Sequence, residues 1–125
     1  MRKVTRGVVS AFLEGRSKRI DNTETDGVSL RLHGNTIAEW RPDGLWITDA
    51  GWPSRTTRER LNGLLLSVNP VSAIGYVWTH RGVQHLTIPD VYVKSWDGSW
   101  IQIPCNHERS IRHLALIASK QKEVA

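Results

Sequence analysis

The stretch GWPSRTTRERLNGLLLSV, residues 51–68, decides the fold because it predicts a short helix with one buried face. Thr56 followed three residues later by Glu59 is typical of a capping box, in which each side chain satisfies a free backbone N–H at the helix start. An apolar stripe then recurs at the spacing of one helix face. Its members are Leu61, Leu64, Leu65 and Val68. Pro70 limits how far the helix continues.

The residues before this helix predict an antiparallel meander. Apolar and polar residues alternate from Val28 to His33, as in a half-buried strand. Gly34-Asn35 is a two-residue turn that leads into a strand over residues 36–41. Pro42-Asp43-Gly44 turns again into a strand over residues 45–49, and connections this short join antiparallel neighbours. We expect the leucine stripe to pack on sheet residues such as Leu30, Leu32, Ile37 and Ile47.

The residues after the helix return to a period of two. A strand over residues 73–79, a turn at Arg81-Gly82 and a strand over residues 83–88 predict one hairpin. Residues 91–96 and 99–103, separated by Asp97-Gly98, predict a second hairpin.

Segments at the two ends complete the predicted fold. Val4 to Glu14 fits a short helix, and residues 15–27 have the composition of a loop. Asn106 is placed to cap a last helix, whose apolar face is Ile111, Leu114, Ala115 and Ala118. The whole chain, residues 1–125, is therefore expected to be a single α+β domain with a basic N-terminal segment and loop over residues 1–27. It has an antiparallel sheet, or two small sheets, of six or seven strands with two or three short helices.

Positive charge is concentrated near the N-terminus. The chain carries a net charge of +5, and residues 1–19 account for all of it, because this segment contains six basic residues and one acidic residue, Glu14. The six are Arg2, Lys3, Arg6, Arg16, Lys18 and Arg19. A basic end on a neutral body indicates a polyanion or an acidic partner, although a solvated basic terminus has the same composition.

A second basic set lies at the predicted helix start and comprises Arg55, Arg58 and Arg60. Phosphate groups are contacted by arginines, small polar side chains and helix N-termini, and the segment from Ser54 to Arg60 combines all three. Arginines in the first turn of a helix interact unfavourably with the helix dipole. Their presence there indicates that they bind a partner. Pairing with Asp43, Asp49 or Glu59 is the structural alternative. Both basic sets therefore predict binding of nucleic acid; the alternative is a protein–protein interaction module that modulates or inhibits an acidic host protein.

Six of the nine aromatic residues are tryptophans. Buried indoles in the core or beside hairpins explain this composition, and the alternative is that one or two are exposed for stacking or protein contact. Exposed edge strands together with these indoles are also compatible with a symmetric homodimer.

The sequence argues against an enzyme and against a bound cofactor. It contains no Walker pattern, no G-x-G-x-x-G and no G-x-S-x-G, and its carboxylates are scattered. Cys105, His107 and His113 have metal-ligand side chains, but their spacing is not that of a standard zinc site and a fourth ligand is missing. A single cysteine fits a reducing cytoplasm, and no stretch reads as a signal peptide or a membrane span.

Three segments carry a resemblance to small uncharacterised proteins encoded by bacteriophages and prophages. They are Leu32-His33-Gly34-Asn35-Thr36-Ile37-Ala38, Gly51-Trp52-Pro53, and Thr56-Thr57-Arg58-x-Arg60-Leu61-Asn62. In those proteins an L-x-G-N-x-I-A hairpin is followed by G-W-x-T-x-T-T-x-x-R-L-N, and Ser54 here replaces the first threonine of the second pattern. The resemblance covers about residues 26–66. It implies a phage or mobile-element origin and a place in the bacterial cytoplasm, but no activity and no functional residue.

Overall fold

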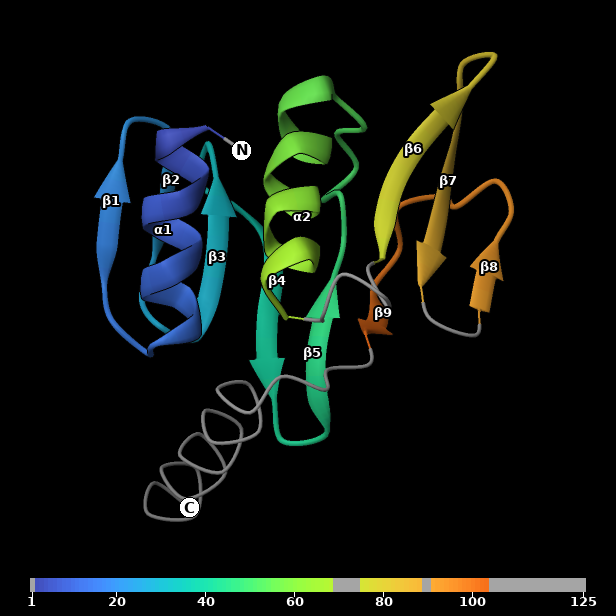
Figure 1. The fold of residues 1–125 in the computed structure, drawn as a ribbon. Coiled ribbons are helices and arrows are strands. Elements are labelled where there is room, and N and C mark those ends of the chain that lie inside the picture. The colour runs from blue at the N-terminus through green and yellow to red at the C-terminus, as the bar shows by residue number, and fades with distance from the viewer. Residues whose placement is uncertain (1, 69–74, 89–90, 104–125) are drawn as a thin grey trace.

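The computed structural model of the chain describes residues 2–68, 75–88 and 91–103 (Figure 1). These residues contain two helices, α1 (Lys3–Leu13) and α2 (Arg55–Val68), and nine strands in two antiparallel sheets. The first sheet is made of β1 (Lys18–Ile20), β2 (Thr23–Thr25), β3 (Ser29–Leu32), β4 (Asn35–Arg41), β5 (Gly44–Ile47) and β9 (Ile101–Ile103), in that order. The second is made of β6 (Tyr76–His80), β7 (Val83–Ile88) and β8 (Val91–Val93). The predicted α+β class is confirmed, with more strands than the six or seven expected.

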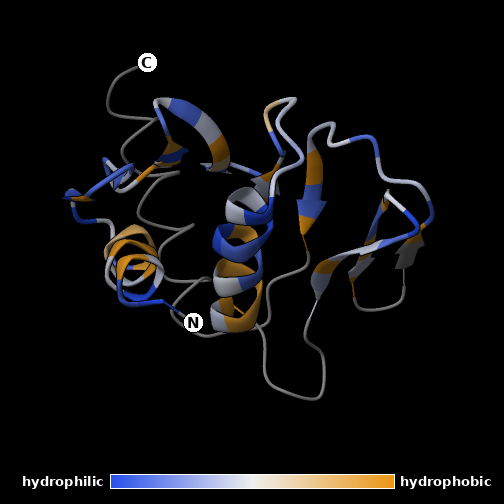
Figure 2. Cartoon of the chain, turned by 90° about the horizontal axis from the view of Figure 1, so that it is seen from above, coloured by the Kyte–Doolittle hydropathy of each residue, from blue (hydrophilic) through white to orange (hydrophobic). Residues whose placement is uncertain are grey.

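Helix α2 lies between α1 and the second sheet, and both helices lie against the first sheet (Figure 1). The two helices begin at the same end of the molecule, where the turn between β6 and β7 also lies (Figure 1). The hydrophobic residues of α1 gather on one side of the helix, as the view from above shows (Figure 2). The helix starts and the β6–β7 turn therefore form one end of the protein.

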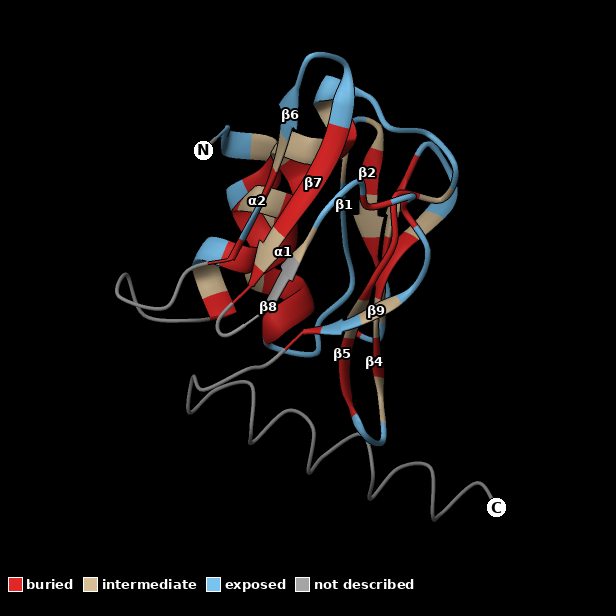
Figure 3. Cartoon of the chain, turned by 90° about the vertical axis from the view of Figure 1, so that its right-hand side faces the viewer, coloured by how far each residue is buried: buried red, intermediate tan, exposed pale blue. Residues whose placement is uncertain are grey.

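One hydrophobic core connects the two helices and the two sheets. The predicted stripe of Leu61, Leu64, Leu65 and Val68 is fully buried, and it shares a cluster with Leu30, Leu32, Ile37 and Ile47 as expected. The second sheet contributes buried residues such as Val77 and Leu86 to the same cluster, and buried residues line β4, β5 and β7 in Figure 3. Trp40 stacks on Phe12 with 5.5 Å between ring centroids, which ties α1 to β4.

The prediction of a loop over residues 15–27 is wrong, because this segment contains β1 and β2. Its polar composition is accommodated in the interior by hydrogen bonding. Thr25 is buried and its hydroxyl donates to the carbonyl oxygen of Ser29 at 2.6 Å, while the hydroxyl of buried Thr23 accepts a hydrogen bond from Arg60. Hydroxyls that are satisfied in this way cost little to bury, so composition alone misidentified two strands.

The first hairpin turn falls one residue earlier than predicted. Leu32 pairs with Asn35, so His33 and Gly34 are the two turn residues rather than Gly34 and Asn35. Both turn residues have positive φ, at 51° and 79°, which is the backbone of the mirror-image turn that two-residue hairpins prefer.

Helix α2 is capped by Ser54, and the predicted capping box of Thr56 and Glu59 is wrong. The Ser54 hydroxyl accepts the N–H of Thr57 at 3.1 Å, and the Ser54 carbonyl accepts the N–H of Arg58 at 3.0 Å. Thr56 lies within the helix, and the Glu59 carboxylate bonds to Thr5 and Arg60 instead of capping. The cap is therefore two residues earlier than the sequence pattern indicates.

The predicted hairpin around Asp97-Gly98 is also wrong, because its two strands belong to different sheets. Strand β8 pairs with β7, whereas β9 pairs with β5 in the first sheet. The Gly98 carbonyl accepts hydrogen bonds from the Asp49 N–H and from the Thr48 hydroxyl, so this turn packs on the end of β5. The helix predicted from Asn106, and the residues Cys105, His107 and His113, lie outside the described residues.

Candidate functional site

A groove of about 820 Å³ runs between the start of α2 and strand β6, which is an edge strand of the second sheet. One wall carries arginines and the other carries Trp78 and Thr79. The complete lining is Arg2, Arg55, Arg58, Glu59, Asn62, Gly63, Leu66, Val77, Trp78 and Thr79. This groove is larger than two other hollows of the described residues, of about 470 and 420 Å³, and it contains two of the three arginines predicted from the helix start.

Asn62 holds the two walls of the groove at a fixed spacing. Its side-chain amide donates to the Val77 carbonyl at 2.9 Å, and its amide oxygen accepts the Val77 N–H at 2.6 Å. The amide therefore pairs with the exposed edge of β6 as a neighbouring strand would. Because α2 is capped by Ser54 and its leucine stripe is buried, the arginines on its first turns stand on a rigid element.

Arg2, Arg55 and Arg58 make one wall of the groove positive. None of these three guanidinium groups forms an ion pair with a described residue. Arg58 donates to the Pro53 carbonyl at 3.1 Å, which orients its side chain. The starts of α1 and α2 lie at the same end of the molecule (Figure 1), and helix N-termini carry partial positive charge. Side chains and backbone therefore favour an anion at this end.

Glu59 lies in the same groove, but its charge is already balanced. Its carboxylate accepts hydrogen bonds from the Thr5 hydroxyl, the Arg2 N–H and the Arg60 guanidinium. Burial raises the pKa of Glu59, but these hydrogen bonds and the positive charge of Arg60 outweigh burial, so the pKa lies below its ordinary value. Glu59 is therefore ionised at neutral pH and paired with Arg60, which leaves the charges of the three groove arginines uncompensated.

Arg60 was expected to be exposed with Arg55 and Arg58, and this expectation is wrong. Arg60 is only 3% exposed and lies between α1, α2 and β2. Its Nε donates to Thr23 at 2.8 Å and its Nη1 to Thr5 at 2.9 Å, in addition to the bond with Glu59. The guanidinium is therefore occupied by the protein's own interior and points to no external partner in this structure.

The basic residues near the N-terminus are separated by the fold. Arg2, Lys3 and Arg6 lie at the start of α1, and Arg2 alone among the six reaches the groove. Arg16 is paired with Glu14 at 2.7 Å, beyond the other end of α1. Lys18 and Arg19 are exposed on β1, the edge strand of the first sheet that lies on the opposite side of the helices from β6 (Figure 1). The predicted set is thus divided between two ends and two sides of the molecule.

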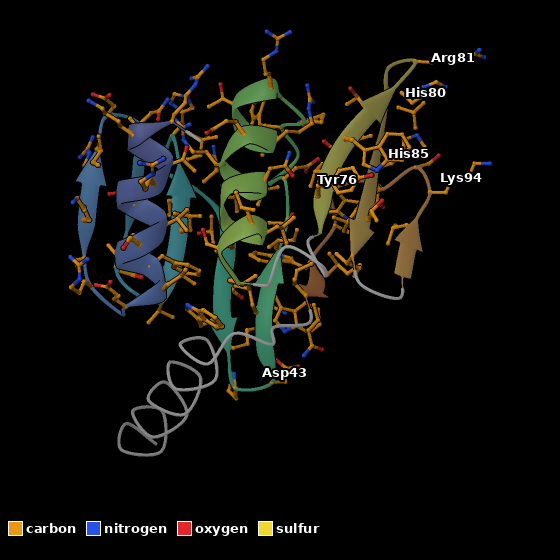
Figure 4. All side chains as sticks on the ribbon, viewed as in Figure 1. Asp43, Tyr76, His80, Arg81, His85 and Lys94 are labelled. Carbon is orange, nitrogen blue, oxygen red and sulfur yellow. The ribbon has the colours of Figure 1, made fainter. Side chains whose placement is uncertain are left out.

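Aromatic residues on the second sheet were not predicted as part of a site. Trp78 stacks on His85 with 4.4 Å between ring centroids and 19° between ring planes, and Tyr76 lies 6.4 Å from Trp78. The signal was present in the sequence, because Tyr76, Trp78 and His80 recur with period two. The two-residue turn at Arg81-Gly82 then sets Trp78 opposite His85. Figure 4 shows Tyr76, His80 and His85 on this hairpin.

A second hollow, of about 470 Å³, lies on the other side of the α2 start. It is lined by the β3–β4 hairpin and by the segment that precedes α2. Trp52 lies at this hollow with 65% of its surface exposed, which is the highest exposure among the large hydrophobic side chains of the described residues. An exposed indole beside a hollow is a surface that suits a protein partner.

The fold and the site together define a small two-sheet α+β domain with an arginine-lined groove. The chain belongs to the Kyanoviridae Gp96 protein family, whose family model matches residues 1–101. This match supports the expected phage origin and extends well beyond the segments that carried the resemblance. Comparisons with curated proteins and with solved structures found no match. Neither helix in the described residues combines the length and the apolar character that crossing a membrane requires.

Proposed function

We propose that this phage protein binds nucleic acid through the groove between α2 and β6. The observation that carries the proposal is that Arg2, at the start of α1, and Arg55 and Arg58, on α2, line one groove, and that their guanidinium groups form no ion pair with a described residue. Guanidinium groups bind phosphate with charge-assisted, often bidentate hydrogen bonds. Thr79 adds a polar side chain of the kind that also contacts the nucleic-acid backbone.

The test compares two double variants that remove the same charge. R55Q/R58Q neutralises the groove, whereas K18Q/R19Q neutralises exposed residues on β1, on the far side of the helices. Binding of labelled oligonucleotides is measured by fluorescence anisotropy at two salt concentrations. We expect R55Q/R58Q to weaken binding by at least about tenfold and to reduce the salt slope by about two, because two phosphate contacts are lost. K18Q/R19Q should weaken binding only slightly.

Arg2, Lys3 and Arg6 provide a third arm of the same experiment. They lie at the start of α1 next to the groove, so neutralising all three should weaken binding to every sequence alike and flatten the salt dependence. R55Q/R58Q should cost more for each charge removed, because these arginines stand on a capped and packed helix. Equal losses in all variants would show a general charge effect and contradict the groove. No binding at low salt by the parent would refute the proposed function.

A protein–protein interaction is the second candidate, and exposed Trp52 favours it. Large exposed aromatic residues commonly dominate the energy of protein interfaces. In this case a host protein should be recovered stoichiometrically by the tagged parent and lost with W52A. Nucleic-acid binding should be unchanged in that variant, because Trp52 is not part of the groove lining.

A further inference from the structure

We infer, resting on the proposed function, that the nucleic acid is single-stranded and that its bases stack on the outer face of the second sheet. Tyr76 and Trp78 are two residues apart on β6, so their side chains leave the same face of the sheet. Val77, between them, is buried in the core, and so is Leu86, its partner on β7. The aromatic side chains therefore lie on the face that points away from the core.

These rings are held in place before any ligand arrives. The Trp78 indole N–H donates to the Thr87 hydroxyl at 3.0 Å, and its ring stacks on His85. The N–H of Ser95 donates to Nδ1 of His85 at 3.3 Å, so the imidazole is fixed as well. A surface whose side chains are already ordered loses little conformational entropy on binding.

Tyr76 gives this aromatic row an accessible end. Its side chain is 47% exposed, and its ring lies 6.4 Å from that of Trp78 at an angle of 36°. His80 and Arg81 lie at the β6–β7 turn, at the other end of β6 from Tyr76, and Lys94 follows β8 on the same sheet (Figure 4). An exposed aromatic ring accepts a base on its face, and cationic side chains on the same sheet favour the phosphates of the bound strand.

Trp78 belongs both to the aromatic row and to the lining of the arginine groove. A strand whose phosphates contact Arg55 and Arg58 therefore places its bases next to Trp78 and Tyr76. Bases in a duplex are stacked on each other and offer no free face to a protein ring, whereas unpaired bases do. The combination of arginines and aromatic rings along one path thus selects a single strand over a duplex.

The experiment uses the whole chain and three labelled probes: a 15-nucleotide oligo-dT, a 15-nucleotide oligo-rU, and a 15-base-pair DNA duplex. We expect the parent to bind the single strands at least about tenfold more tightly than the duplex. Y76A should weaken single-strand binding by about five- to a hundredfold and leave duplex binding unchanged. Y76F, which keeps the ring, should bind as the parent does. V83A is the matched control, because Val83 is exposed on the same hairpin and carries no ring.

Each outcome decides the inference. Equal binding of single strands and duplex, with Y76A unchanged but R55Q/R58Q weakened, overturns the stacking surface and leaves the proposed function intact. Failure of the parent to bind any probe at low salt overturns both. A preference for oligo-rU or oligo-dT assigns RNA or DNA to the same surface. Thermal melting of Y76A and V83A confirms that both variants are folded, so a loss seen with Y76A alone is a loss of stacking.

Discussion

The buried guanidinium of Arg60 is expected to be a major contributor to stability, and R60M tests this directly. Methionine keeps an unbranched side chain about as long as the arginine stem but removes the guanidinium, with its charge and its donors. The substitution takes a cation away from Glu59 and hydrogen-bond donors away from Thr5 and Thr23. Removing one partner of a buried ion pair costs roughly 3–5 kcal/mol. The Glu59 side chain is 23% exposed, so water offsets part of this loss. We expect a cost of about 3 kcal/mol.

Urea and thermal unfolding followed by circular dichroism measure this cost. For a domain of this size about 3 kcal/mol corresponds to a fall in Tm on the order of 10 °C. R58Q is the matched control, because Arg58 lies on the same helix but faces the groove, and it should change stability by less than about 0.5 kcal/mol. E59Q/R60M completes a double-mutant cycle, in which the pair should cost less than the sum of the single variants. A stability of R60M within about 0.5 kcal/mol of the parent would refute the network.

Four further outcomes are expected. L64A should lose about 2–5 kcal/mol in urea unfolding, because Leu64 is fully buried; a variant as stable as the parent would mean that the stripe is not in the core. The pKa of Glu59 is lower in the folded protein than its ordinary value of 4.5, so the ionised carboxylate stabilises the fold at a pH above 4.5. This stabilisation is lost as the pH falls through the lowered pKa. The free energy of unfolding of E59Q should therefore fall less steeply on acidification than that of the parent. G98A should destabilise strongly, since Gly98 has φ +84° and an added Cβ would overlap the Asp49 carboxylate; an unchanged Tm would show that this turn does not pack on Asp49. Light scattering at high protein concentration should give twice the chain mass if the homodimer forms, and a monomer mass would rule it out.

Local patterns predicted the elements that depend on neighbouring residues. The leucine stripe of α2 and the strand after Arg81-Gly82 are where period and turn chemistry placed them. The strand before this turn, predicted over residues 73–79, is β6 over Tyr76–His80, and residues 73 and 74 lie outside the described residues. The Asp97-Gly98 turn misled the prediction because its strand partners are chosen at a distance. Gly98 packs on Asp49, and that contact separates β8 from β9.

The candidate site was predicted only in part, because some of its residues are positioned by partners far away in the sequence. Arg55 and Arg58 could be predicted because they lie on the polar side of an amphipathic helix. The burial of Arg60 could not be predicted, because its partners Thr5 and Thr23 come from elements far away in the sequence. The aromatic row could have been predicted from its period of two and its turn.

The return of β9 to the first sheet has a consequence for how the chain folds. Pairing of β5 with β9 joins residues as far apart in sequence as Leu45 and Ile103, and the whole second sheet is encoded between them. Contacts of such long separation close large loops and form late. During synthesis, β5 is therefore an unpaired edge until β9 leaves the ribosome, and an open edge invites pairing with other chains. Ribosome-bound chains that end before β9 should be far more prone to aggregate than chains that contain β9.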